Sequence, residues 1–311
     1  NTVFATKIYH TLDLINQFSE QGRKDMANFI KSFQKKDSSI YDPLIKRKTF
    51  LKDKLSAIKN LNFNNFSHQQ TIRAETRQSI SALKLLKDKP GIPYQNFPKT
   101  EEEIENYLSK LNWQKPWAAG SHFSPLLFFL ENSEGENKEG LITFAINWVN
   151  KLQNSQDGSW YKGRSTQQQK INEAMKIITG LKVVERVDFN YPEKLIDLCL
   201  SAKNDDQSCD NFNIVYVLKY AKELTQSQYR YSEIKNFALD RLEIYQRYYF
   251  PEIGGFPFFP NKANQYYYVA KITKELNSPD IHGTCMFLWG ISIISQILGI
   301  DKKLKFKEQI P

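Results

Sequence analysis

The chain has 311 residues, of which 41% are hydrophobic and 25% charged, a balance typical of globular rather than disordered proteins. Its three cysteines are too few for a disulfide framework, so we expect a reducing, cytoplasmic setting. No run of about 18 apolar residues occurs, so the sequence predicts no membrane-spanning helix. The first residues, NTVFATKIYH, do not resemble a secretion signal.

The formal net charge is +9, and most of the excess lies near the N-terminus. Residues 23–59 contain eleven Lys or Arg against four Asp or Glu. Such a segment is usually a solvated helix face, although it could also contact an acidic partner or a membrane surface. Neither zinc-finger spacing nor an RNA-binding aromatic motif occurs, so nucleic acid is not an expected partner.

Taken in chain order, the first helices are polar on one side. Apolar residues recur at helical spacing in residues 7–18, 23–35 and 69–87, which predicts amphipathic helices there. The sequence Lys89-Pro90-Gly91 is a strong stop for the third of them.

The next two helices begin at recognisable caps. Thr100 and Glu103 match a capping box, in which the Thr side chain accepts a hydrogen bond from the Glu amide, and this helix should run to about residue 112. Ser121 is expected to cap the following helix, because Pro125 then falls in its first turn. Residues 126–130 are all apolar, so this helix should be buried.

The remaining helices alternate between two types. Amphipathic runs occupy 140–153, 192–202 and 232–248, and runs that are more apolar all round occupy 167–179, 211–223 and 280–298. Turns at Gly120, Gly158, Ser208 and Gly255 lie about 38 to 50 residues apart, a period typical of repeat architectures. The aromatic run 255–259 is the only candidate strand.

These patterns predict a single all-α domain over 1–311. We expect an α/α toroid of about six helical hairpins, with apolar helices inside and amphipathic helices outside. Residues 1–67 would form a basic, helical extension that packs on the ring or completes it. An open α-solenoid, built from the same helix pairs, is the alternative.

The turn 152–162, LQNSQDGSWYK, is the most distinctive stretch. Trp160 is expected to pack into the core and Asp157 to bond the backbone, with Gln153 and Gly158 completing the turn. Gly255 and Phe256, in EIGGF, would form the matching turn of a later unit.

Three segments resemble known families. WVNKLQNSQDGSW (148–160) resembles the Gln-Trp repeat of triterpene cyclases, and EIGGF (252–256) is similar to its later copies. PDIHGTCMFLWGISIISQ (279–296) is similar to the last inner helix of protein prenyltransferase β subunits. The resemblance covers roughly the last 200 residues. It implies an α/α toroid and an enzyme that acts on an isoprenoid or isoprenyl diphosphate in a central aromatic cavity.

The sequence departs from both families at their reactive motifs. It has only Asp205-Asp206 where cyclases have Asp-x-Asp-Asp, and it lacks the Asp-x-Cys pair of the prenyltransferases. The donor types that suit zinc are nevertheless present, and the candidate metal ligands are Cys209, Asp210, His282 and Cys285. Both cysteines also suit the role of small buried residues.

Candidate site residues come from the first turns of the expected inner helices, where free N–H groups and the helix dipole favour anions. The catalytic candidates are His282, Asp210, His122 and Asp280. His282 with Asp210 would make an acid–base pair if both face the cavity, whereas Asp280 is equally an ordinary N-cap. The substrate-binding candidates are Trp117, Lys170, Asn172, Lys176, Asn213, Tyr266, Tyr267 and Trp289.

Three functions fit these residues. The first is the isoprenoid enzyme that the resemblance implies, whose aromatic cavity would stabilise cationic or apolar groups. The second is a lyase, hydrolase or epimerase acting on an acidic glycan, with Tyr266–Tyr268, His282 and Asp210 in the site. The third is a non-catalytic toroid that binds a partner through its basic N-terminal third.

Overall fold

The computed structural model describes residues 1–45, 67–203, 205–225, 228–268 and 270–309. Helices dominate these residues, so the predicted all-α class is confirmed. The helices are α1 (Thr2–Thr11), α2 (Glu20–Lys31), α4 (Ser67–Leu85), α5 (Glu101–Ser109), α6 (Pro116–Glu131), α7 (Lys138–Asn150), α8 (Gln167–Val183), α9 (Pro192–Leu200), α10 (Ser208–Leu224), α11 (Tyr231–Tyr248), α12 (Ile281–Leu298) and α13 (Asp301–Leu304), with a 3-10 turn at Ile15–Gln17.

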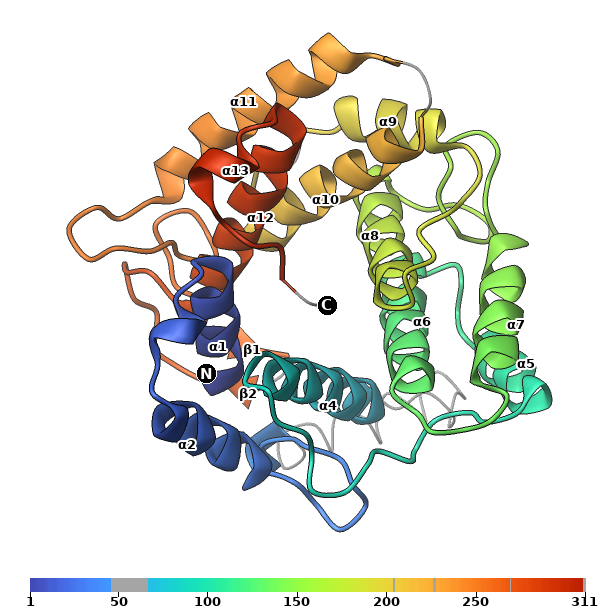
Figure 1. Ribbon diagram of the computed structural model, residues 1–311. Coiled ribbons are helices and arrows are strands. Elements are labelled where there is room, and N and C mark those ends of the chain that lie inside the picture. The colour runs from blue at the N-terminus through green and yellow to red at the C-terminus, as the bar shows by residue number, and fades with distance from the viewer. Residues whose placement is uncertain (46–66, 204, 226–227, 269, 310–311) are drawn as a thin grey trace.

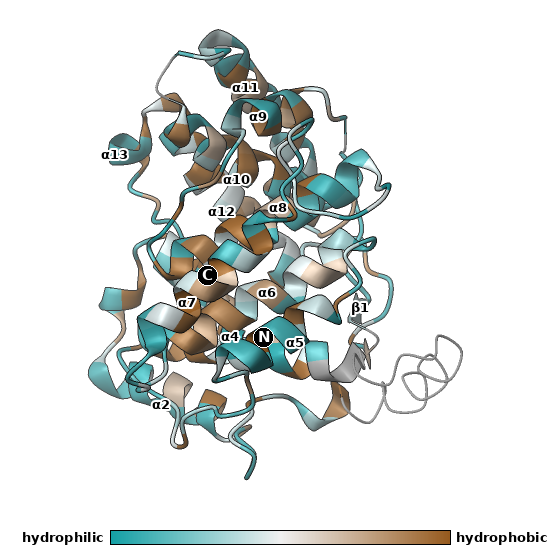
Figure 2. Ribbon diagram, turned by 90° about the vertical axis from the view of Figure 1, so that its right-hand side faces the viewer, coloured by the Kyte–Doolittle hydropathy of each residue, from teal (hydrophilic) through white to brown (hydrophobic). Residues whose placement is uncertain are grey.

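Alternate helices contact one another in a closed cycle. In the described residues α1 packs against α4, α4 against α6, α6 against α8, α8 against α10, α10 against α12, and α12 against α1. The helices α2, α5, α7, α9 and α11 lie outside this cycle (Figure 1). Figure 2 shows hydrophobic segments where the helices pack together and hydrophilic segments on outward-facing sides. The inner helices therefore surround the middle of the molecule.

The helices of the cycle differ in what they bury. In α6, α10 and α12 buried side chains occur around most of the helix, as Leu127, Leu218 and Ile293 illustrate. In contrast, the buried side chains of α1 are all polar, and α4 buries Arg77 beside its leucines. The prediction of apolar inner helices is therefore wrong for the two helices nearest the N-terminus.

The N-terminal segment belongs to the cycle, because α1 lies between α12 and α4. Near the other end of the chain, Lys307 N donates to Thr11 O at 2.8 Å, and Gln309 Nε2 donates to Thr11 Oγ1 at 3.1 Å. Much of the basic segment 23–59 falls on residues 46–66, which lie outside the described residues.

Two helix starts test the capping predictions. Thr100 Oγ1 accepts from Glu103 N at 3.1 Å, which confirms the cap of α5, and the Glu103 carboxylate accepts from Lys99 N. The predicted cap at Ser121 is wrong, because α6 already begins at Pro116. Proline suits a first turn since it has no N–H to leave unpaired. Ser121 therefore lies inside the helix, where its hydroxyl donates to Trp117 O at 2.8 Å.

The turn after α7 has the contacts expected of a structural brace. Trp160 is fully buried, and its backbone N–H donates to Glu173 Oε2 at 3.0 Å. Asp157 accepts from Ser159 N at 3.1 Å and from Lys170 Nζ at 2.7 Å. Gly158 has φ +75°, a conformation that residues other than glycine rarely adopt.

The corresponding turn before α12 is built differently. Gly255 has φ +114°, and the buried Phe256 packs against Phe287 with ring centroids 5.0 Å apart. No strand forms over 255–259. Instead, β1 (Tyr266–Tyr267) and β2 (Ala270–Lys271) make a small antiparallel hairpin. The prediction misplaced the strand because the Tyr-rich stretch carries no alternation to mark it.

Within the described ranges, α12 alone is long and apolar enough to cross a membrane by length and composition. Since 61% of that helix is buried inside the protein, its apolar character is that of a core helix.

Candidate functional site

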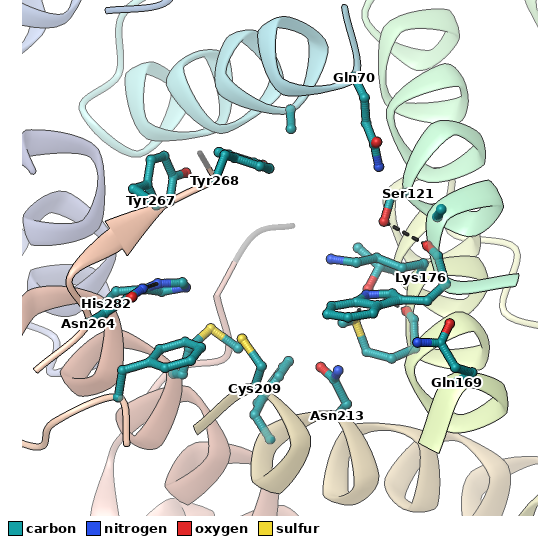
Figure 3. Close-up of a pocket in the computed structure, with 18 of the residues that line it drawn as sticks. Gln70, Ser121, Gln169, Lys176, Cys209, Asn213, Asn264, Tyr267, Tyr268 and His282 are labelled. Carbon is teal, nitrogen blue, oxygen red and sulfur yellow. Dashed lines mark hydrogen bonds between the residues drawn. The ribbon is translucent and has the colours of Figure 1, made fainter. Parts of the chain in front are cut away.

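A cavity of about 1390 Å³ lies among the inner helices. Its walls come from α4, α6, α8, α10 and α12, from the loop residues 114–115 and 164–166, from Phe4 of α1 and from the segment 258–268 around the hairpin. Figure 3 shows Lys176 and Gln169 on one side, with Tyr267, Tyr268 and His282 on the other. Side chains from distant parts of the sequence therefore face one space.

The described cavity wall is cationic and rich in amides. Its charged side chains are Arg77, Lys115, Arg164, Lys176 and Lys262, and none of its described residues is Asp or Glu. Its amide side chains are Gln70, Gln78, Gln114, Gln169, Asn213, Asn264 and Gln265. Lys262 forms an ion pair with Glu275, which lies outside the wall. The other four cations favour an anionic ligand, and the amides favour one that makes many hydrogen bonds.

Lys176 is a partly buried cation at the centre of this arrangement. No described residue forms an ion pair or hydrogen bond with its ammonium group, which points into the cavity (Figure 3). Burial, and after it the nearby charge of Arg77, lowers the pKa of Lys176 to about 8. Both causes disfavour a bare ammonium group, so an anion bound beside Lys176 would restore its charge.

Several buried polar atoms on the wall lack a partner. Those of the described lining residues are Arg77 Nε and Nη1, Ser124 Oγ, Asn213 Oδ1 and Trp289 Nε1. Buried polar atoms are nearly always hydrogen-bonded in native proteins. Their gathering at one cavity therefore indicates a place that a polar ligand or water fills.

His282 lies between aromatic rings on the opposite wall. Its ring stacks on Phe4 at a centroid distance of 4.9 Å and lies 4.8 Å from Phe258. Burial lowers the pKa of His282 to about 4, and Asn264 Nδ2 donates to its Nδ1 at 3.4 Å. His282 is thus neutral at pH 7 and faces the cavity without a carboxylate beside it.

The other catalytic candidates lie away from the cavity. Asp210 accepts from Gln168 Nε2 at 2.9 Å and Gln207 Nε2 at 2.8 Å and does not line the wall, so the expected pair with His282 does not form. Asp280 caps α12 through Gly283 N at 2.8 Å and also accepts from Phe258 N. The Asp280 carboxylate therefore stabilises the start of α12 and the loop that contains Phe258.

His122 is likewise displaced from the cavity. It is buried against Arg73, whose Nη2 donates to its Nδ1 at 2.7 Å, and Tyr107 lies beside it. Burial, followed by the charge of Arg73, lowers its pKa to about 3. Since α6 begins at residue 116, Ser121 lines the cavity and position 122 turns toward α4 and α5.

The substrate-binding candidates divide in two. Those on the cavity wall are Trp117, Lys176, Asn213, Tyr266, Tyr267 and Trp289. Lys170 is not there, because it pairs with Asp157 and lies over the Tyr161 ring. Asn172 is fully enclosed and bonds Asp210 and Asn213 behind the wall.

The candidate zinc ligands do not form a metal centre. Among the described residues no group of three or more His, Cys, Asp or Glu side chains is placed to hold a metal ion. Asp210 is used by the amides, and Cys285 Sγ lies 3.3 Å from Gln309 Nε2. Burial raises the pKa of Cys209 to about 12 and of Cys285 to about 11, as expected of small buried thiols. The expectation that Cys209, Asp210, His282 and Cys285 together form a zinc site is therefore wrong.

The sequence reasoning missed the contribution of α4. Arg77 and Gln70 of this helix reach the cavity, as does Asn264 from the loop before α12, which was also missed. One signal for Arg77 was present, because it precedes Ile80 by one helical turn and so adjoins the apolar stripe of α4.

Comparisons with known proteins give no family. No protein-family model matches the chain, and no curated protein sequence matches it.

Proposed function

We propose that the closed cycle of helices is an α/α toroid of the kind found in terpenoid cyclases and protein prenyltransferases. The Gln-Trp-like turn at 148–160 and the alternation of inner and outer helices support this assignment. The contact of α1 with α12 favours a closed ring over an open solenoid.

We further propose that the cavity binds an acidic carbohydrate. The observation that carries this proposal is the composition of the described wall: five Lys or Arg, seven Asn or Gln, and no carboxylate. Lys and Arg attract the acid group, the amides suit the hydroxyls, and exposed aromatic faces such as Trp117 suit sugar rings.

The reaction that fits these groups is β-elimination from a uronate. In that reaction a base removes the proton next to the carboxylate, the bond to the leaving oxygen breaks as the double bond forms, and an acid protonates the leaving oxygen. Lys176 is the proposed base: its charged form attracts the carboxylate, and the reaction proceeds from the minority of complexes in which it has lost its proton, a fraction that its lowered pKa increases near neutral pH. Arg77 would offset the carboxylate charge, and the hydroxyl of Tyr268, which lines the wall, would supply the proton.

Hydrolysis by a carboxylate pair has no candidates on the described wall, because no Asp or Glu lies there. An isoprenyl diphosphate is the second candidate ligand. It is favoured by the apolar part of the wall, in which Phe212, Trp289 and Met286 are neighbours of the cations.

Calorimetric titration with trigalacturonate and with farnesyl diphosphate distinguishes these ligands. We expect trigalacturonate to bind and the Lys176→Met and Arg77→Met variants to lose at least tenfold in affinity, since each removes a cation of the cavity wall. Lys151→Met, at an exposed position after α7, is the control and should bind normally. Preferential binding of farnesyl diphosphate would favour the isoprenoid function.

Ultraviolet absorbance of the conjugated product then tests the reaction. A rise in absorbance that Lys176→Met abolishes supports elimination. Binding without product would leave a non-catalytic carbohydrate-binding toroid.

A further inference from the structure

Asp210, Asn172 and Asn213 form a chain of hydrogen bonds that ends at the cavity wall. Asn172 Nδ2 donates to Asp210 Oδ1 at 3.2 Å, and Asn213 Nδ2 donates to Asn172 Oδ1 at 2.7 Å. Asp210 is 8% exposed and the two asparagines at most 1%, so water does not compete for these bonds.

The chemistry of the three groups sets the direction of the chain. A carboxylate oxygen only accepts, so Asn172 must turn its NH₂ group toward Asp210. Its carbonyl oxygen then faces the other way, toward Asn213. Gln168 Nε2 also donates to both Asp210 Oδ1 and Asn172 Oδ1, which holds the same orientation. Asn213 must therefore present its NH₂ group to Asn172.

One polar atom of these three side chains has no hydrogen-bond partner among the described residues. This atom is Asn213 Oδ1, which is buried. Asn213 lines the cavity and points into it (Figure 3). A buried carbonyl oxygen without a donor is unfavourable, and its position makes it available to a molecule in the cavity.

We propose that Asn213 Oδ1 accepts a hydrogen bond from the ligand, and that Asp210, acting through Asn172, is a positioning residue that holds it in this orientation. The inference rests on the proposed function and narrows the ligand to an anion that also carries hydroxyl donors. A uronate meets both requirements. An isoprenyl diphosphate, ionised at neutral pH, offers anionic oxygens and a hydrocarbon chain but no donor for Asn213.

The test compares two probes by calorimetry: trigalacturonate, and its derivative in which every hydroxyl is O-methylated and the carboxylates are kept. The wild-type protein should bind the methylated probe at least tenfold more weakly, because the hydrogen bond to Asn213 is lost together with those to the other wall amides. Asn213→Leu keeps the side-chain volume without an acceptor, so this ratio should fall by about tenfold, the contribution of that one bond. Asp210→Asn should also lower it, because both asparagines can then reverse.

The control is Asp197→Asn, which removes a carboxylate on the outer helix α9 that pairs with Arg230. It should leave the ratio unchanged. A ratio that Asn213→Leu leaves at the wild-type value overturns the inference, while binding of trigalacturonate still upholds the proposed function.

A readout without ligand keeps the two proposals separate. By NMR, the side-chain amide protons of Asn213 should exchange slowly in the wild-type protein and faster in Asp210→Asn. If trigalacturonate fails to bind, the proposed function falls and this measurement decides the orientation alone. Slow exchange upholds the fixed acceptor, and fast exchange in the wild-type protein overturns it.

Discussion

Gln153 and Asn190 form a reciprocal pair of hydrogen bonds between two loops that lie 37 residues apart in sequence. Gln153 Nε2 donates to Asn190 O at 2.5 Å, and Asn190 N donates to Gln153 Oε1 at 3.0 Å. The same amide nitrogen also donates to Gly158 O at 2.8 Å. The Gln153 side chain therefore links the two loops through one donor and one acceptor, as a strand backbone links to its neighbour in a sheet.

Gln153→Glu should destabilise the protein by about 2–3 kcal/mol, because a carboxylate oxygen would replace the donor and face two carbonyl oxygens. The free energy of unfolding from denaturant titration measures the loss. Gln156→Glu, an exposed position in the same turn, is the matched control and should stay within about 0.5 kcal/mol of the wild type. Equal effects of the two variants would refute the structural role of Gln153.

Gly158 and Gly254 separate backbone strain from steric contact. Their φ angles are +75° and +77°, but a Cβ at Gly158 would lie 2.7 Å from Tyr191 O, whereas a Cβ at Gly254 meets nothing within 4 Å. Gly254→Ala should cost about 1 kcal/mol from conformation alone. Gly158→Ala should cost clearly more, since Tyr191 must also move. Thermal unfolding of both variants checks the order, and a reversed order would contradict it.

Lys176 should make ligand binding dependent on pH. Its pKa is lowered to about 8, so it is charged below pH 8 and loses its charge above. The affinity for an anionic probe should fall above pH 8 by up to tenfold per pH unit, because one proton is required for the strong binding state. Titrations of trigalacturonate from pH 6.5 to 9.5 measure this slope.

The control for this dependence is Lys176→Met, which should bind weakly and with little change over the same range. Lys7, whose pKa burial lowers to about 7, does not line the cavity, so Lys7→Met should keep the decline above pH 8. For the stability of the ligand-free protein, the effect of raising the pH has the opposite sign. In the unfolded chain Lys176 keeps its proton up to the ordinary lysine pKa of 10.5, so the wild type should gain stability relative to Lys176→Met between pH 8 and 10.5.

Tyr267 ties the hairpin to α4, because its hydroxyl donates to Glu75 Oε1. Tyr267→Phe would leave the Glu75 carboxyl without this partner, and burial already raises the Glu75 pKa. We expect a loss of about 1–3 kcal/mol and faster amide hydrogen exchange in residues 266–268 and 270–271. Tyr266→Phe is the control, since Tyr266 is 52% exposed. Unchanged exchange in the Tyr267 variant would rule out this tether.

The sequence predicts most of the helices, because their apolar residues recur at the helical period in both amphipathic and buried segments. The helix expected over 7–18 is wrong in its bounds, since α1 covers Thr2–Thr11 and a 3-10 turn follows at Ile15–Gln17. The sequence also predicts the cap of α5, since Thr100 and Glu103 act within a single turn. It fails where a helix start depends on a choice between two signals. Ser121 was the expected start of α6, but the helix begins at Pro116, and this earlier start decides which face of α6 carries His122.

The cavity could be predicted only in part. Lys176, Asn213 and Trp289 follow from the expectation that inner helices begin near the site, and they do line the wall. Asp210 lies in the first turn of the same helix as Asn213, yet it points behind the wall. Neighbouring helical positions differ by about 100°, so a shift of one residue changes the side chain's surroundings. The place of Arg77 on the wall could not be predicted from local patterns alone, because they do not show that α4 borders the cavity.

The contact between α1 and α12 has a consequence for synthesis of the chain. Gln309 bonds Thr11 across 298 residues, so the ribosome must add all of these residues before α1 meets this neighbour. At typical bacterial and eukaryotic rates that delay is roughly 15 to 60 s. During that time the polar face of α1, with Thr6 and Lys7, stays hydrated at little cost, where a leucine-rich face would invite aggregation. A polar α1 therefore suits a helix whose partner, Gln309, is synthesised 298 residues later.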